Sequence, residues 1–259
     1  MTRDNSNPQT KGQLVEGGVS SEHGKVRSAK PNSTVATINH LGVELFLDPA
    51  ILSPLLMDSI KSGRYEHVEA SEIKRIIQKG ERVIELGAGI GFISTLIARN
   101  PHVEALRVFE ANPDLVPYIR RVHEANNVSR AEVVNAVLAN DLSGGPTRNF
   151  YIRRDFWASS LTPEPWAYTR VEPVQVRSFN AEIEQFRPTL IVCDIEGGEL
   201  ELFMQANLTG VRKVYLEVHQ RVLGRAGMKQ LFDAFSARGF HYDQHHSKGS
   251  VILFSHVKR

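Results

Sequence analysis

The chain has 259 residues, 41% of them hydrophobic and 23% charged, an ordinary composition for a soluble globular protein with one large α/β domain. The formal net charge is +2, and acidic and basic residues balance after residue 36, so the composition gives no sign of a nucleic-acid-binding protein. The single cysteine excludes an intramolecular disulfide, and neither a secretory signal nor an apolar stretch of membrane-spanning length is present, so we expect a cytoplasmic protein.

The first eighty residues divide into a tail and a lead-in. Residues 1–36 are rich in Ser, Asn, Gly and charge, and we expect a disordered tail because such a segment buries too little apolar surface to offset its ordering entropy. Residues 37–80 predict a β-hairpin with its turn near Leu41-Gly42, and then two amphipathic helices, the second of which ends at Gly80.

Residues 81–259 alternate apolar strands with amphipathic helices, which predicts one α/β domain with an insert at about 143–178. The expected strands cover residues 82–86, 106–109, 133–138, 189–195, 214–218, 240–243 and 251–254. Repeated strand–helix units predict a Rossmann-like, seven-stranded, mostly parallel sheet with helices on both faces and a ligand site at the carboxyl ends of its strands.

A glycine-rich turn follows the first strand of this domain. In the sequence VIELGAGIGF, Gly87, Gly89 and Gly91 let the backbone turn tightly and approach a ligand. A dinucleotide-binding turn requires a further glycine at position 92, which is Phe92. The G-x-G-x-G spacing, preceded by Glu85, instead resembles motif I of class I S-adenosylmethionine-dependent methyltransferases. That resemblance implies that Glu85 orients the amino-acid part of the cofactor and that the glycines line it.

Glu110 ends the next expected strand. A carboxylate at this point can accept two hydrogen bonds from a ribose diol, and both dinucleotide-binding proteins and methyltransferases place an acid there. Glu110 therefore supports cofactor binding without distinguishing between the two families.

A further resemblance, to the FkbM family of methyltransferases, extends from about Leu47 to Glu217. Five blocks carry it in the family's order: Tyr65-Glu66 ahead of the glycine turn, AVLAND at 136–141, Ser159-Ser160-Leu161, the D-x-E-G-x-E block at 194–199, and the acid-ending strand YLEVH at 215–219. The family's turn usually reads D-V-G-A-N-x-G, so Glu85 here replaces Asp and Gly89 replaces Asn. The resemblance implies S-adenosylmethionine as cofactor, with Tyr65 and Glu66 at its site, and we expect Asn135 and Ala136 near its adenine.

Methylating an alcohol requires a group that removes the hydroxyl proton. Four candidates follow two neighbouring strands at the edge where the methyl group is expected: Asp194, Glu196, Glu217 and His219. We expect Asp194 or His219 to be the base. The same side chains could instead bind a hard divalent cation, but their spacing is not typical of a metal site, and we predict none.

Other polar and aromatic residues have weaker functional support. Glu199 and Glu201 are predicted to be solvated, because they lie on a helix whose other face is apolar. In the insert, Trp157, Ser159 and Ser160 are candidate substrate contacts, and Trp157 could equally anchor the insert.

The FkbM resemblance implies methyl transfer to a hydroxyl group of a sugar or polyketide-type natural product. We therefore expect a small-molecule hydroxylated acceptor and no nucleic-acid partner. The alternatives are an N-methyltransferase or macromolecule methyltransferase, a dinucleotide-dependent oxidoreductase, and a non-catalytic S-adenosylmethionine-binding regulator. The sequence does not determine the oligomeric state.

Overall fold

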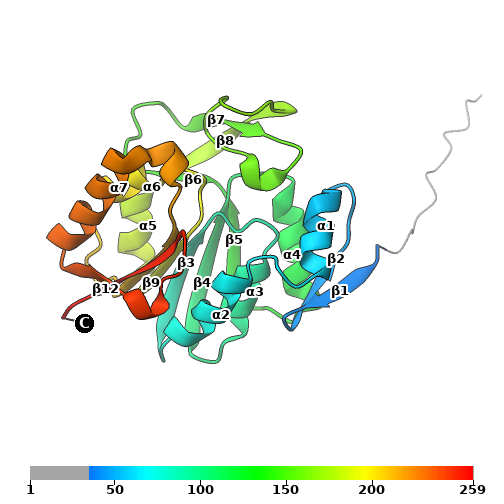
Figure 1. Ribbon diagram of the computed structural model, residues 1–259, viewed down its shortest axis with the longest axis horizontal. Helices are drawn as coiled ribbons and strands as arrows, with labels where there is room; N and C mark the ends of the chain where they lie inside the picture. The colour runs from blue at the N-terminus through cyan, green and yellow to red at the C-terminus, as the bar shows by residue number, and fades with distance from the viewer. Residues whose placement is uncertain (1–34, 259) are drawn as a thin grey trace, which may run out of the picture. The chain divides into compact units, whose positions relative to one another are not determined.

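Alternating apolar side chains on the central strands point into two separate cores, one on each face of a sheet. The computed structural model describes residues 35–258, which belong to one unit. On β3 (Glu81–Leu86), Val83 packs into one core and Ile84 into the other. The strands β9 (Leu190–Cys193) and β10 (Lys213–Glu217) alternate in the same way. The sheet is therefore covered on both faces (Figure 1).

The main sheet has seven strands in the order β11-β12-β10-β9-β3-β4-β5. The remaining strands are β4 (Val103–Glu110), β5 (Ala131–Asn135), β11 (Phe240–Tyr242) and β12 (Val251–His256). β12 runs antiparallel to β10 and β11, while the other neighbouring strands pair in parallel. The predicted seven-stranded, mostly parallel α/β sheet is confirmed.

Helices and a hairpin supply the two cores. The first core contains β1 (Thr37–His40), β2 (Val43–Phe46), α1 (Pro54–Lys61), α2 (His67–Ile76), α3 (Phe92–Arg99) and α4 (Leu115–Ala125). The second contains α5 (Phe179–Phe186), α6 (Glu199–Met204) and α7 (Gln220–Ala237). Among these helices, α5 is not predicted by the sequence pattern. Among residues 35–258, no helix combines the length and the apolarity that crossing a bilayer requires.

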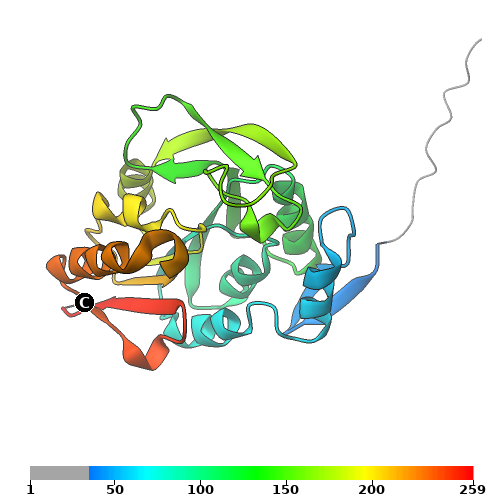
Figure 2. The same cartoon turned by 45° about the horizontal axis from the view of Figure 1, so that its top comes forward.

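The strand predicted over residues 133–138 is broken at Ala136. β5 ends at Asn135, and the chain then leaves the main sheet to form β6 (Val137–Ala139). β6 pairs with β8 (Arg170–Ser178), which also pairs with β7 (Thr147–Ile152) in a second, three-stranded sheet. Figure 2 shows this smaller sheet above the main one. The expected insert is thus a sheet of its own, and its β7–β8 loop contains a 3₁₀ turn, Phe156–Ala158.

A buried charge cluster fastens the amino end of β3. Glu81 is fully buried and accepts hydrogen bonds from Thr189, at 3.1 Å, and from Arg212, while Lys213 Nζ lies 2.8 Å from its other oxygen. A buried carboxylate is tolerated when it is paired in this way. The cluster lies at the end of the strand opposite to the glycine turn and has a structural role.

Candidate functional site

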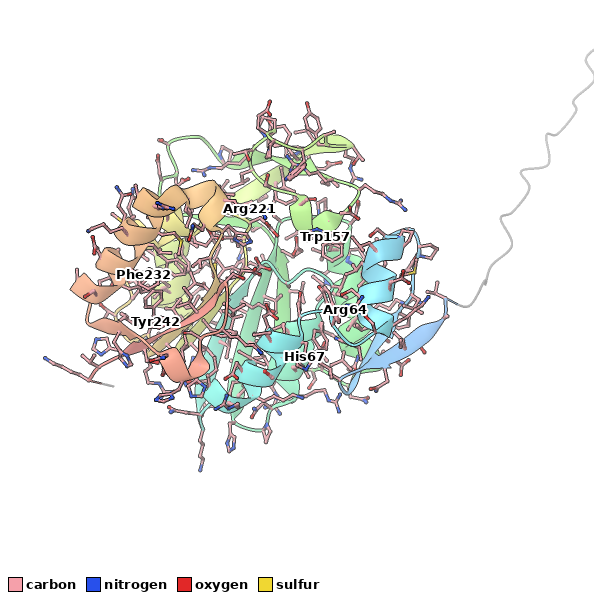
Figure 3. The ribbon with its side chains drawn as sticks, in the orientation of Figure 1. Arg64, His67, Trp157, Arg221, Phe232 and Tyr242 are labelled. Atoms are coloured by element: carbon pink, nitrogen blue, oxygen red, sulfur yellow. The ribbon has the colours of Figure 1, made fainter. Side chains whose placement is uncertain are left out.

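A cavity of about 580 Å³ opens where β3, β4, β9 and β10 end. The glycine turn, the β5–β6 break and the insert all contribute to its wall. Arg64, from the lead-in, and Trp157, from the insert, line it on the side where these two segments meet (Figure 3). A pocket of this size accommodates a drug-sized ligand.

Glycine is required at two positions of the turn. Gly87 has φ +78°, and a Cβ there would lie 1.7 Å from the backbone oxygen of Asp194, so the turn and the end of β9 meet without room for a side chain. Gly89 has φ +54°, and its Cβ would press on Phe156 and Tyr65 at 3.3 and 3.4 Å. Aromatic groups thus occupy the space beside the position where the FkbM family usually has asparagine.

The acid after β4 holds the turn in place. Glu110 is 6% exposed; its Oε2 accepts a hydrogen bond from the Gly89 backbone nitrogen at 2.9 Å, and its Oε1 accepts one from Asn112 nitrogen at 2.7 Å. Burial raises the pKa of Glu110 to about 7, although these backbone donors favour the ionised form. Glu110 lines the cavity, as the sequence predicts for a cofactor-binding acid.

Glu85 is buried on β3 with an unsatisfied oxygen. The residue is 2% exposed, and within residues 35–258 its Oε2 has no hydrogen-bond partner. Burial and the nearby Glu110 raise the pKa of its carboxyl to about 8. Glu85 borders a small cavity of about 40 Å³ that Glu66, Asp194 and Glu217 also line. A buried carboxyl without a partner is costly, so this group calls for a donor or a cation from a ligand.

The Tyr65-Glu66 pair lies beside the glycine turn, where a Cβ on Gly89 would lie 3.4 Å from the Tyr65 hydroxyl. The backbone oxygen of Tyr65 is hydrogen-bonded to His40 Nε2 at 2.8 Å, and its ring packs 5.9 Å from that of Phe92. Burial raises the pKa of Glu66 well above its usual value. Both residues line the larger cavity.

The adenine-side candidates have different positions. Ala136 lines the cavity together with Val137. The Asn135 amide instead donates hydrogen bonds to the backbone oxygens of Glu110 and Ala111, at 2.8 and 3.0 Å. Asn135 therefore ties β5 to the end of β4 and fixes the strand break.

The four candidate catalytic residues gather at the ends of β9 and β10. His219 Nε2 lies 3.2 Å from Glu196 Oε2 and 3.8 Å from Asp194 Oδ1. Asp194, Glu196 and Glu217 line the cavity, and Glu217 Oε1 also accepts a hydrogen bond from Ser250 Oγ at 2.8 Å. Burial, together with the neighbouring acids Glu217 and Glu196, raises the pKa of Asp194 well above its usual value. His219 lies behind these carboxylates.

The prediction that Glu199 is solvated is wrong. Its side chain is fully buried, and its Oε1 lies 2.7 Å from His219 Nδ1 and accepts a hydrogen bond from the Gly197 backbone nitrogen at 3.0 Å. Helical periodicity failed here because the first turn of α6 packs against the start of α7, whose N-cap residue is His219. Glu201, two residues on, is exposed as expected and pairs with Arg148.

Three members of the same cluster lie close enough together to hold a metal ion. One atom each from Asp194, Glu217 and His219 lies within 4.8 Å of the other two. Both ring nitrogens of His219 already face carboxylates, Nδ1 that of Glu199 and Nε2 that of Glu196. The absence of a metal from this group stays a prediction.

The insert is organised by a residue that the sequence analysis did not single out. Arg153 is 5% exposed and donates hydrogen bonds to the backbone oxygens of Thr162 and Pro163, both at 3.0 Å, and to Ser160 Oγ at 3.1 Å. Its backbone nitrogen donates to Ser159 Oγ at 3.0 Å. Both serines line the cavity, yet their hydroxyls are engaged in holding the loop. In the sequence, the signal for this role was an arginine placed between a strand-like segment and an aromatic loop.

The strand order, the antiparallel β12, the glycine turn and the acid after β4 together define a Rossmann-like, S-adenosylmethionine-dependent methyltransferase domain. The sequence matches the model of the methyltransferase FkbM domain over residues 85–242, and the chain belongs to this family. Membership of this methyltransferase family excludes the alternative of a dinucleotide-dependent oxidoreductase.

Comparisons with individual proteins add only distant likenesses. No curated protein matches the sequence. Pyrococcus abyssi Trm5b is 14% identical, with a TM-score of 0.48 over 88% of this chain and 57% of that one. M. jannaschii TYW2, solved with AdoMet, is 11% identical, with a TM-score of 0.44 over 88% and 90%. P. abyssi tRNA (uracil-54, C5)-methyltransferase, solved with S-adenosyl-L-homocysteine, is 12% identical, with a TM-score of 0.48 over 85% and 43%. Each TM-score is below 0.5, so none bears on this chain's activity.

The residues present fit the family's cofactor. Among the described residues, the oxygen of Glu85 that lacks a partner suits an ammonium group, Glu110 suits a ribose diol, and Gly87 lets the turn pack directly against the end of β9. When bound, S-adenosylmethionine supplies a methyl group on a sulfonium, which is an electrophile for a nucleophilic oxygen or nitrogen.

Proposed function

We propose that this chain methylates a hydroxyl oxygen of a small molecule such as a sugar or a polyketide-type natural product. The observation that carries the proposal is the group of carboxylates, Asp194 and Glu196, that lines the cavity where β9 ends and is backed by His219. Because an alcohol is a poor nucleophile, its methylation needs a proton acceptor at this place. Methylation of a neutral amine depends less on such a proton acceptor.

The charge of the cavity favours an uncharged acceptor over a nucleic acid. Six acidic residues line it, and only two arginines do so: Glu66, Glu110, Asp194, Glu196, Glu201 and Glu217, against Arg64 and Arg148. Arg148 is further neutralised by Glu201, at 3.3 Å. Nucleic-acid sites depend on basic surfaces that replace counterions on phosphates. A polyanionic acceptor is therefore disfavoured at this cavity.

The chain's own residues then have distinct roles. Asp194, at the point where β9 meets the glycine turn, accepts the proton of the acceptor hydroxyl, and Glu196 supports its orientation. Trp157 and the β7–β8 loop cover the cavity and limit access of water. Orienting the two reactants and removing one proton is the main work that such an enzyme has to do.

A labelling screen tests the proposal. The purified chain is incubated with S-adenosylmethionine carrying a ¹³C methyl group and with panels of hydroxylated sugars, polyketide alcohols, amines, protein and tRNA. We expect a small hydroxylated acceptor to gain one methyl group whose ¹³C shift is that of a methyl ether. Asp194→Asn should abolish turnover while cofactor binding persists, and Glu104→Gln, an exposed residue on β4, is the matched control.

The other outcomes identify the alternatives. An N-methyl signal, or label in protein or tRNA, would replace the proposal by amine or macromolecule methylation. Cofactor binding without turnover on any panel would favour a non-catalytic regulator.

A further inference from the structure

Glu199 and His219 form a buried pair behind the carboxylates that line the cavity. Glu199 is fully buried, and its Oε1 lies 2.7 Å from His219 Nδ1. The side chain of His219 is 17% exposed, and its other nitrogen, Nε2, faces Glu196 and Asp194 at 3.2 and 3.8 Å. The four groups thus form a chain from the buried start of α6 to the cavity.

With Glu196 and Glu199 ionised, the ring can satisfy both neighbours only in its charged form. A neutral imidazole has one N–H donor and one acceptor, so a ring that donates to Glu199 from Nδ1 would turn the lone pair of Nε2 toward the oxygens of Glu196. An imidazolium donates from both nitrogens and fits both contacts. Within residues 35–258, no lysine or arginine pairs with Asp194, Glu196 or Glu199 within 4.0 Å, so His219 is the available cation.

We infer that Glu199 is a positioning residue that holds His219 as an imidazolium, with its Nε2–H directed at Glu196 and Asp194, so that the carboxylates at the cavity stay ionised and oriented. The inference rests on the proposed function for its catalytic meaning. It changes the role of His219 from a candidate base to a fixed cation that supports the base. Neither residue lines the cavity itself.

The charges around the ring agree with this assignment. Burial opposes the charged ring, but the hydrogen bond to Glu199 and the charges of Glu199, Glu196 and Asp194 raise the pKa of His219 to about 9. Burial raises the pKa of Glu196 to about 7, and the charge of His219 works in the opposite direction. Glu217 on β10 also raises the pKa of Asp194 and Glu196, and Glu66 and Glu85 are further acids beside Asp194.

Nitrogen NMR of the histidine rings tests the pair without any acceptor. A ¹⁵N-labelled sample is titrated between about pH 5 and 10, and the ring of His219, one of ten histidines, is assigned by its loss in His219→Gln. We expect both nitrogens of His219 to be protonated at neutral pH. In Glu199→Gln, which keeps an acceptor but removes the charge, the pKa of His219 should fall by about 1–3 units. Glu201→Gln, on the same helix but exposed, should leave it unchanged.

A second variant separates charge from orientation. Glu199→Met removes both the charge and the acceptor, so the neutral ring should lose its preference for the Nδ1-protonated form, whereas Glu199→Gln should keep it. If Glu199→Met does not fold, the wild-type and Glu199→Gln titrations decide the question. A wild-type ring that is neutral at pH 7, or an unchanged titration in Glu199→Gln, would overturn the inference.

The rate profile provides a readout that a purely structural role would not move. With an acceptor found in the labelling screen, His219→Gln, which removes the imidazolium at every pH, should move the acid limb of the profile of kcat against pH to higher pH, because the base carboxylate then ionises later. A lower kcat with an unshifted limb would contradict the inference. If no acceptor is methylated, the proposed function fails while the NMR result for the pair still stands.

Discussion

The carboxylate of Glu110 accepts a hydrogen bond of 2.9 Å from the backbone nitrogen of Gly89, so the end of β4 is tied directly to the glycine turn after β3. The same carboxylate accepts a hydrogen bond from Asn112 with its other oxygen. One side chain therefore shapes the turn and also borders the cavity in which the cofactor would lie.

Replacing Glu110 by alanine should weaken the binding of S-adenosylmethionine. The variant loses a charged acceptor worth about 1.5–3 kcal/mol per hydrogen bond, so the dissociation constant should rise about 10- to 100-fold in calorimetric titration. Glu104→Ala, exposed on the same strand, should bind as the wild type does. Unchanged affinity in Glu110→Ala would mean that this acid does not contact the cofactor.

The buried Glu85 should make the cofactor-free protein less stable as the pH rises. Its pKa is raised to about 8 in the folded state, so its contribution to stability is fully present below its unfolded value and is lost as the pH rises through 8. The free energy of unfolding should fall by about 1.4 kcal/mol per pH unit for this group between pH 5 and 8. Urea unfolding at a series of pH values measures this change in the free energy of unfolding.

Other acids titrate in the same range, so the comparison with a variant isolates Glu85. Glu85→Gln should show a shallower dependence of the free energy of unfolding on pH than the wild type, and Glu104→Gln should match the wild type. Parallel curves for the wild type and Glu85→Gln would show that the carboxyl is not buried as described.

Alanine at Gly87 should cost far more than alanine at Gly63, although both glycines have positive φ. At Gly63, φ is +73° and a Cβ would meet nothing within 4 Å, so only the backbone strain of about 1–2 kcal/mol applies. At Gly87 the Cβ would also overlap the backbone oxygen of Asp194. Thermal unfolding and calorimetry should show a modestly lowered Tm with normal cofactor binding for Gly63→Ala, and a larger loss with no binding for Gly87→Ala. Equal effects would exclude the steric explanation.

Arg153 should control the insert and leave the cofactor site intact. Arg153→Ala removes the donors that hold the backbone oxygens of Thr162 and Pro163, and Arg153→Lys cannot replace a planar set of five donors. Limited proteolysis should cut both variants faster within the β7–β8 loop, while the affinity for S-adenosylmethionine stays within about twofold. Arg154→Ala, next in the chain and exposed, is the control. If Arg153→Ala resisted proteolysis as well as the wild type does, contacts other than those of Arg153 would stabilise the loop.

The sequence by itself determined the class of the protein, because the signals for it are local. Recognising the apolar run of β9 requires only neighbouring residues, and so does recognising the spacing of Gly87, Gly89 and Gly91. The seven strands, the hairpin and the acid Glu110 were all predictable from such patterns. The helix α5 was missed because its eight residues follow directly on β8, without a linker of their own.

The tertiary structure decided the state of the catalytic group. Helical periodicity placed Glu199 in solvent, but burial depends on what packs against a helix, and the start of α7 brings its N-cap residue His219 onto that carboxylate. The break at Ala136 likewise follows from the pairing of β6 with β8, about forty residues further along the chain. Contacts between distant segments are set by how whole elements pack, so they alone fix which charges meet at the cavity and which are removed from water.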